Sequence, residues 1–413
     1  MNSIREFLRS AWIKARLTSP SFVNRAIEPY LHEGKEIVRL LSQPHLPIYE
    51  LQGQGQGGPL SVTYVGLNLA KPYLKSILFE EDPVEREVGQ APFWRTDRLV
   101  DGLPGDIVIV EAYQRLIHRL PRQNALVLPH YVFPILDVRG DWQDVRSRLF
   151  KTVRTHELRL VRKHGYTYRV SHDPQDFEEF YHQMYWPTMD GRHGELSSPM
   201  SIAKAHQYFQ HGWLFRVERD DEWVSGLICY LQQNTVIAQI MGVRDADTQL
   251  MRDGAASTLY YTAVHWANQN GYEAVNFLGT EPFLDAGQFR YKRKWGTAMS
   301  IPPQLHRRIW LKVQRVTPAV STFLQENPCI VVDDRRKELY GLIVVDDLDS
   351  VTTDTKERWE ERYTTLGLSH LAVRSVNDFA EGLLDDHGPD LVIPIASTSS
   401  SKSAHDTQNK SRS

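Results

Sequence analysis

Four titratable side chains could act as a general acid or base. Glu281 and Asp285 follow a strand-like run that ends at Gly279, and His193 lies in a loop between glycines. A carboxylate or an imidazole can take a proton from an attacking amine, and a phenol such as Tyr291 can protonate a leaving group. The structural alternatives are a helix cap for Glu281, a surface charge for Asp285, a loop residue for His193 and a core aromatic for Tyr291.

A second group of residues could hold phosphate. Arg252 and Asp253 precede Gly254-Ala255-Ala256, which open a helical pattern that runs to Asn270. The first turn of a helix has unpaired N–H groups and the positive end of the helix dipole, and small side chains let a pyrophosphate approach. We therefore expect residues 252–256 to bind the phosphates of a coenzyme.

Five polar or cationic side chains are candidates for substrate contacts. Lys292 and Lys294 lie in a segment that otherwise reads as packed, and their charge could hold a phosphate, a carboxylate or RNA. Gln239 and Asn276 lie on two strands that we expect on opposite sides of a cleft, and Arg192 lies in the loop of His193. A solvated surface is the alternative for the two lysines.

Residues 144–164 read as one helix with a strong excess of positive charge. One face is apolar, and the helix ends at Gly165. Its cations are Arg146, Arg148, Lys151, Arg154, Arg159, Arg162 and Lys163, against only Asp144 and Glu157. Such a run is most often a solvated face, and binding of an anion is the alternative.

The elements that must position these side chains follow a definite order. The expected order is strand 166–170, helices 174–184 and 200–210, strands 213–218, 222–231 and 235–243, a helix from Gly254 to Asn270, and strand 274–278. A helical crossover makes the last strand parallel to its neighbour. This order predicts an α/β (α+β) fold with a mixed sheet flanked by helices.

The order resembles that of the GNAT acetyltransferases. Their phosphate signature is Arg or Gln, two residues, Gly, one residue, then Gly or Ala, and it is matched here by Met251–Ala256 except at Met251. Residues 271–279, residues 289–296 with their aromatic-Lys-x-x-aromatic-Gly pattern, and the basic helix ending at Gly165 resemble the Fem-like (FemAB-type) branch. The resemblance covers about residues 126–305.

The resemblance implies an N-acyltransferase with an amine acceptor. In the GNAT fold two parallel strands, here 235–243 and 274–278, splay apart and leave a cleft for an acyl thioester. The donor implied is an acyl-CoA or, in the Fem-like branch, an aminoacyl-tRNA; the acceptor is a small-molecule or peptide amine. A non-catalytic scaffold on the same fold is a third reading.

The amine attacks directly, so no cysteine nucleophile is required. Cys229 lies in a strand and is expected to be buried and inert.

The remaining features set the expected organisation. The 413 residues, with a net charge of −3, suffice for several domains. We expect an N-terminal region, 1–124, with a helical start and a reduced first GNAT-like copy; a transferase domain, 125–315; a small α/β domain, 325–396; and a disordered tail, 397–413.

The spacing of cysteines and histidines predicts no metal site. Apolar runs are too short for a membrane span, so a cytoplasmic location is expected. The oligomeric state is left open.

Overall fold

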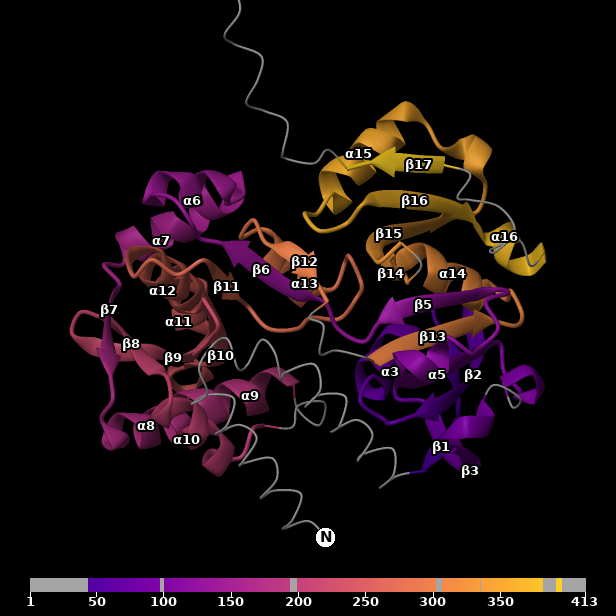
Figure 1. Cartoon of the computed structure of the whole chain (residues 1–413), viewed down its shortest axis with the longest axis horizontal. Helices are drawn as coiled ribbons and strands as arrows, with labels where there is room; N and C mark the ends of the chain where they lie inside the picture. The colour runs from indigo at the N-terminus through magenta and orange to yellow at the C-terminus, as the bar shows by residue number, and fades with distance from the viewer. Residues whose placement is uncertain are drawn as a thin grey trace, which may run out of the picture.

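Three sheets make up the described part of the chain. The computed structural model describes residues 44–96, 100–193, 199–301, 307–334, 336–381 and 391–395. The helical start and the C-terminal tail expected from the sequence lie outside these ranges. Figure 1 shows the largest sheet on the left, a second sheet on the right and the smallest sheet above the second.

The first sheet is built mainly from residues 45–129 and is called the first unit. Its order is β3-β1-β2-β4-β13-β5, with β2 and β4 parallel. The strands are β1 (His45–Gly55), β2 (Gly58–Gly66), β3 (Val84–Pro92), β4 (Ile107–Tyr113), β5 (Ala125–Pro129) and β13 (Arg307–Val313), with helices α3 (Lys71–Leu78) and α5 (Gln114–Ile117). Every residue of β4 is buried, as its continuous apolar run requires.

The second sheet forms the unit in which the sequence predicts the transferase domain, and this unit is called the transferase unit below. Its order is β12-β6-β11-β10-β9-β8-β7, and β10 and β11 are parallel. The strands are β6 (Phe133–Asp137), β7 (Thr167–Ser171), β8 (Trp213–Arg219), β9 (Glu222–Gln232), β10 (Thr235–Val243), β11 (Ala274–Asn276) and β12 (Ala298–Ser300). The helices are α8 (Pro174–Phe180), α9 (Trp186–His193), α10 (Ile202–Gln210), α11 (Thr248–Arg252), α12 (Ala255–Gln269) and α13 (Gly287–Arg293). This is the mixed, helix-flanked sheet that the sequence predicts.

The two units exchange one strand each. β6 follows β5 along the chain but lies between β11 and β12, and β13 follows β12 but lies between β4 and β5. The expected transferase domain, 125–315, therefore gives its first strand and its last strand to the other sheet. β5 and β6 are joined by residues 130–132 alone and yet lie in two different sheets.

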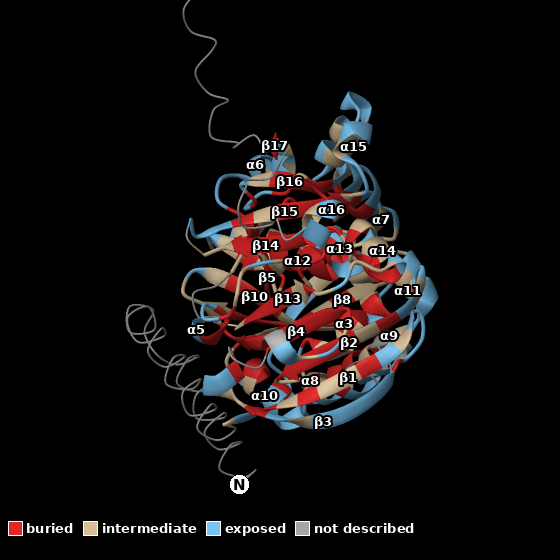
Figure 2. Cartoon of the chain, turned by 90° about the vertical axis from the view of Figure 1, so that its right-hand side faces the viewer, coloured by how far each residue is buried: buried red, intermediate tan, exposed pale blue. Residues whose placement is uncertain are grey.

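The third sheet belongs to a C-terminal unit. Its order is β14-β15-β16-β17. The elements are α14 (Pro318–Glu326), β14 (Cys329–Asp333), β15 (Glu338–Val345), α15 (Thr353–Tyr363), β16 (His370–Ser375), α16 (Val376–Glu381) and β17 (Leu391–Pro394). Figure 2 shows buried residues concentrated in the strands, whereas α15 projects as a largely exposed helix.

The basic segment 144–164 is not one helix, contrary to the prediction. α6 (Trp142–Arg148) ends where Leu149 is extended, and after this break come a π-helical turn, η3 (Val153–Glu157), and α7 (Leu158–Lys163). At this break the chain packs directly against a neighbouring loop. A Cβ on Gly296 would lie 2.2 Å from the carbonyl oxygen of Arg148, so only a glycine allows the two backbones to lie this close. That contact joins segments far apart in the sequence, so helical periodicity could not reveal it.

Within the described ranges, the helices are all too short or too polar to cross a membrane. In the same ranges no three histidine, cysteine or acidic side chains gather as a metal ion would require. Cys229 is buried, and burial raises the pKa of its thiol well above the usual value.

Candidate active site

The parallel strands β10 and β11 separate after a short paired segment. Their register ends at Ile237 opposite Asn276, while β10 continues to Val243. β11 stops because the chain turns at Leu278, which has a left-handed backbone (φ 62°) and whose N–H donates to the Asn276 side chain at 2.8 Å. Gln239 occupies a bulge of β10 at the start of this gap. Two substrate candidates, Gln239 and Asn276, therefore lie at the splay.

Helix α9 closes the far end of the splay. The Thr188 hydroxyl accepts from the N–H of Val243 at 2.9 Å and donates to its carbonyl at 3.1 Å. Gly242 lets this helical segment approach, since a Cβ there would lie 2.4 Å from the Met184 backbone. The edge of β10 that β11 leaves uncovered thus runs from Ala238 to Gly242.

The first turn of α12 is partly covered by the protein itself. Gly254 caps the helix in the left-handed region (φ 99°), and a Cβ there would lie 2.9 Å from Cβ of Leu160. Gly254 and Ala255 are buried, whereas Ala256 is partly exposed and Arg252 is exposed. The accessible side of the expected phosphate site is therefore the side of Arg252 and Ala256.

The covered side holds a carboxylate that the sequence analysis did not single out. Glu157 lies in the π-helical turn and is buried; its two carboxylate oxygens accept from the Ser257 hydroxyl and from the ammonium of Lys294. The Tyr291 hydroxyl lies 2.9 Å from Oγ of Ser257, and burial raises the pKa of this phenol. Tyr291 and Lys294 thus belong to a buried network at the positive end of α12.

Asp253 is held by partners of its own. Its carboxylate accepts from Arg219 at 3.0 Å and from Gln249 at 2.9 Å. Desolvation would raise the pKa of Asp253, but these two hydrogen bonds outweigh it and lower the pKa. Asp253 therefore stays charged, with its charge directed to Arg219.

Lys292 of α13 lies beside the end of β11, and its pKa is shifted strongly by burial. Its side chain is buried, and its ammonium donates to the carbonyls of Leu278 at 3.3 Å and Gly279 at 3.0 Å. Burial lowers the pKa of Lys292 to about 8, and the opposing charge of Glu281 offsets only part of this. An amine with this pKa can take up and release a proton near neutral pH.

Tyr131, in the connection from β5 to β6, lies beside Gly279, and Tyr73 of α3 in the first unit lies next to Tyr131. Val132 bridges to Thr280, and a Cβ on Gly279 would lie 3.2 Å from Cβ of Tyr131. The rings of Tyr131 and Tyr73 are 6.0 Å apart. Burial, with the nearby charge of Glu281, raises the pKa of Tyr131 to about 12, so its phenol keeps its proton. Neither tyrosine was predicted, because their proximity depends on the strand exchange.

A buried carboxylate and a buried imidazole lie behind these tyrosines. Glu111 is fully buried, and its carboxylate lies 3.1 Å from the His130 imidazole and accepts from the N–H groups of Leu69 and Ala70 at 2.9 and 3.2 Å. Desolvation raises the pKa of Glu111, but these partners lower it more. The His130 carbonyl accepts from the Tyr73 hydroxyl at 3.2 Å, which fixes that ring.

The remaining predicted residues occupy three different places. Glu281 is near it and accepts from the Thr280 hydroxyl at 3.3 Å. Asp285 instead faces the C-terminal unit, where it accepts from Arg362 at 2.8 Å and from the Tyr363 hydroxyl at 2.7 Å. Arg192 and His193 end α9, and their side chains lie outside the described part of the structure.

Comparison with known proteins identifies the class of the transferase unit. Residues 147–293 match the sequence model of the GNAT acetyltransferase domain. This stretch is therefore a GNAT-type acetyltransferase domain, and the chain is a transferase of acyl groups. The match confirms the resemblance drawn from residues 251–256 and from the element order.

Solved structures that match the chain include FemX, at 10% identity over 60% of this chain and 80% of that chain with a TM-score of 0.35. L-PGS from Bacillus licheniformis matches at 13% identity over 66% and 87%, with a TM-score of 0.32. A GCN5-related N-acetyltransferase from Kribbella flavida matches at 15% over 62% and 82%, with a TM-score of 0.24. These scores add nothing to the family match. No curated protein matches the chain.

Proposed function

We propose that the chain is an N-acyltransferase that moves an acyl group from acyl-CoA to an amine in the cleft between β10 and β11. The observation that carries the proposal is the buried Lys292, with its pKa of about 8, at the point where the two strands separate. Positioning, a proton acceptor and N–H donors for the developing oxyanion are what direct acyl transfer needs.

In the proposed reaction, neutral Lys292 takes a proton from the acceptor ammonium. The free amine attacks the thioester carbonyl, a C–N bond forms and the C–S bond breaks, and the leaving thiolate takes up the second proton that the attacking nitrogen loses. Glu281 holds the charge of protonated Lys292, and the neutral Tyr131 phenol is a hydrogen-bond donor to the acceptor. The acceptor, a small-molecule or peptide amine, enters from the side of the first unit.

The free edge of β10, residues 238–242, supports the choice of an acyl-CoA. An extended thioester arm can pair with these backbone groups as a strand would. Its phosphates would lie beside Arg252 and Ala256, because Leu160 and Glu157 cover the other side of the α12 N-terminus.

Titration calorimetry with CoA, acetyl-CoA and longer acyl-CoA tests the donor. Ala256→Glu places a negative charge in the phosphate site, and Ala256→Gln is the uncharged control of matching size. We expect binding to wild type and to Ala256→Gln, and none to Ala256→Glu. Equal binding to both variants would mean that the phosphates bind elsewhere. A folded wild type that binds no thioester would exclude acyl-CoA as the donor.

One observation favours a second donor, an aminoacyl-tRNA. Lys151, Arg159, Arg162 and Lys163 are exposed beside α12, and none of them pairs with a carboxylate among the described residues. Such a surface can follow a phosphate backbone. RNA binding that weakens steeply with salt, and is lost in Lys151→Glu/Arg162→Glu, would support this donor. Binding of neither RNA nor thioester would leave the scaffold reading.

A further inference from the structure

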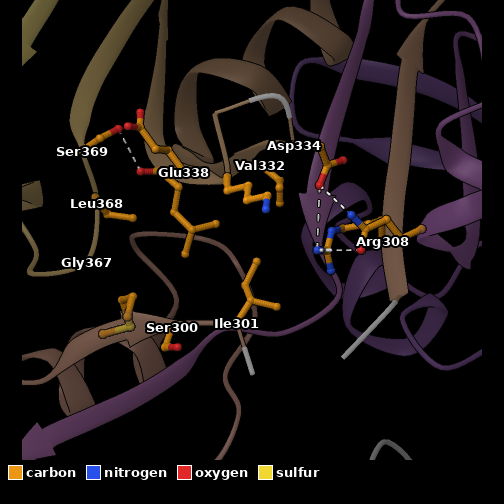
Figure 3. Close-up of a pocket in the computed structure, with 13 residues that line it drawn as sticks. Ser300, Ile301, Arg308, Val332, Asp334, Glu338, Gly367, Leu368 and Ser369 are labelled. Carbon is orange, nitrogen blue, oxygen red and sulfur yellow. Dashed lines mark hydrogen bonds and ion pairs between the residues drawn. The ribbon is translucent and has the colours of Figure 1, made fainter. Parts of the chain in front are cut away.

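Two cavities are lined by the segment that connects α15 to β16. Residues 367–369 line the first cavity, which has a volume of about 670 Å³. Figure 3 shows Asp334 and Arg308 at one end of it and Glu338 at the other. Lys337 lines it beside Glu338, so each end holds a cation and an anion. This cavity therefore offers no net charge to a ligand.

The second cavity lies between the same segment and the transferase unit. It has a volume of about 910 Å³ and is lined by residues of β6, β11 and β12, by the break after α6 and by residues 364–366. Neither Lys292 nor the first turn of α12 lines it, so it is separate from the proposed transferase cleft. Its volume is in the range of sites for small organic ligands.

The charged side chains around the second cavity leave one positive charge unmatched. Its lining holds three guanidiniums, of Arg139, Arg148 and Arg293, and two carboxylates, of Asp137 and Glu273. Asp137 pairs with Arg139 at 2.6 Å, and Arg148 lies 3.7 Å from the same carboxylate. Hydrogen bonds to Asp137 raise the pKa of Arg139, and the charge of Glu273 raises it further. Within the described ranges, neither carboxylate pairs with Arg293.

Arg293 is the cation that remains. Its three nitrogens donate to backbone carbonyls of residues 361–364, and among the described residues it has no carboxylate partner. Burial lowers the pKa of Arg293, and the charge of Asp285 opposes this shift only in part. Each terminal nitrogen keeps an N–H for a further acceptor. The buried hydroxyl of Thr364, which also lines the cavity, has no hydrogen-bond partner in the described part of the chain. An anionic oxygen held by Arg293 would give this hydroxyl an acceptor.

The wall beside Arg293 is apolar. Phe150 and Leu366 are 40% and 37% exposed, and both line the cavity together with Ile135 and Ala298. The Arg293 guanidinium lies over the Phe150 ring, 5.3 Å from its centroid. Contact with water is unfavourable for large apolar side chains, and an apolar ligand would remove it. The unmatched cation and the exposed apolar side chains are therefore neighbours in one cavity.

We propose that this cavity binds an apolar monocarboxylic acid, with its carboxylate at Arg293 and its hydrocarbon part against Phe150 and Leu366. The single unmatched positive charge suits one carboxylate, which a guanidinium binds well. The ligand contacts the transferase unit through Arg293 and the C-terminal unit through residues 364–366. Occupancy therefore also stabilises the contact between these two units.

Calorimetry with octanoate, octanamide and acetate tests the site. Octanamide keeps the chain without the charge, and acetate keeps the charge without the chain. We expect octanoate to bind roughly tenfold or more tightly than either, because the charged hydrogen bond and the apolar contact both contribute. In Arg293→Gln, octanoate and octanamide should bind alike. The matched control is Arg290→Gln, which removes the same charge from an exposed position of α13 and should behave as wild type.

Leu366→Ser tests the apolar wall and leaves Arg293 in place. It should weaken octanoate and octanamide by the same factor, and it decides the question even if Arg293→Gln fails to fold. Circular dichroism establishes that each variant is folded.

Four outcomes would overturn the proposal. Three of them are no binding of octanoate to the folded wild type, equal binding of octanoate and octanamide, and an equal effect of Arg293→Gln and Arg290→Gln. The fourth is displacement of octanoate by CoA, which would place the acid in the transferase cleft instead. None of the probes is a thioester, so the result does not depend on the transferase reaction.

Discussion

At the scale of single residues, Lys292 makes the transferase proposal sensitive to pH. A lysine must be neutral to accept a proton, and burial lowers the pKa of Lys292 to about 8. Activity should therefore rise as the pH increases towards about 8 and level off above it. Lys292→Met should lower kcat by roughly 10²- to 10⁴-fold. Lys292→Arg, which stays protonated, should be nearly as inactive and should lose the rise.

A steady-state pH profile of wild type and both variants checks this prediction. Circular dichroism establishes that the variants are folded. An unchanged profile in Lys292→Met would remove Lys292 from the chemistry and leave it as a residue that orders the turn at Gly279.

The cap of α12 is the second residue-scale prediction. Gly254 adopts φ 99°, and a Cβ there would lie 2.9 Å from Leu160. Gly254→Ala should therefore lower the free energy of unfolding by about 1–3 kcal/mol. In urea titrations, Leu160→Gly should reduce that loss, because it removes the Cβ in contact and leaves only the backbone strain, whereas Leu160→Ala keeps that Cβ and should not. Purely additive effects would contradict a shared contact.

The sequence indicated some residues of the site and missed others for a physical reason. Lys292, Glu281 and Asn276 follow one another within a single strand-and-helix segment, so local pattern was sufficient. Glu157 and Tyr131 are brought to the site by contacts with segments a hundred or more residues away. In the sequence, Glu157 was only one acid among many bases.

At the scale of elements, two side chains dock α15 on the transferase unit. Asp285 accepts from Arg362 and Tyr363, and Arg293 donates to the carbonyls of Thr364 and Glu361 at the end of that helix, both at 3.0 Å. A guanidinium at a helix C-terminus satisfies carbonyls that the helix leaves unpaired. This contact accounts for Asp285 without any role in catalysis.

Asp285→Ala should lower stability and spare the reaction. The variant loses the hydrogen bond from Tyr363 and a partly exposed ion pair, and this should lower the free energy of unfolding by about 1–2 kcal/mol. The unfolding temperature should fall by a few degrees while kcat stays within about twofold of wild type. Glu281→Gln is the converse control, with kcat reduced and the unfolding temperature kept. A large loss of kcat in Asp285→Ala would return this residue to the catalytic candidates.

Most elements could be predicted because their periodicity is local. The strands 213–218, 222–231 and 235–243 and the long helix after Gly254 occur within a residue or two of their expected bounds. The break at Leu149 was not predicted, because the segment keeps a helical period, whereas at the break its backbone contacts residues 294–296, with the Phe150 N–H donating to the Lys294 carbonyl at 3.0 Å. A sequence pattern reports what a segment prefers, whereas this break depends on a distant loop.

At the scale of the whole molecule, the strand exchange joins two units that the sequence suggested were separate. In both sheets a strand from the other unit lies beside the second of two parallel strands, after β4 in one and after β11 in the other. We propose that the first unit is the reduced GNAT-like copy expected for residues 45–125. In this unit the N–H groups of Leu69 and Ala70, at the N-terminus of α3, donate to the Glu111 carboxylate. The carboxylate occupies the position that a phosphate would need.

The exchange predicts that the first unit and the transferase unit unfold together. β13 pairs with β4 and β5, and β6 pairs with β11 and β12. If either strand left its place, the sheet that holds it would be split in two. In native-state hydrogen exchange with added denaturant, the amides of β4 and β10 should show the same opening free energy, within about 1 kcal/mol. β16 and β17 exchange no strand with another sheet and can open earlier. If β10 opened well before β4, the two units would be independent domains, and Tyr73 and Tyr131 would not be fixed parts of the active site.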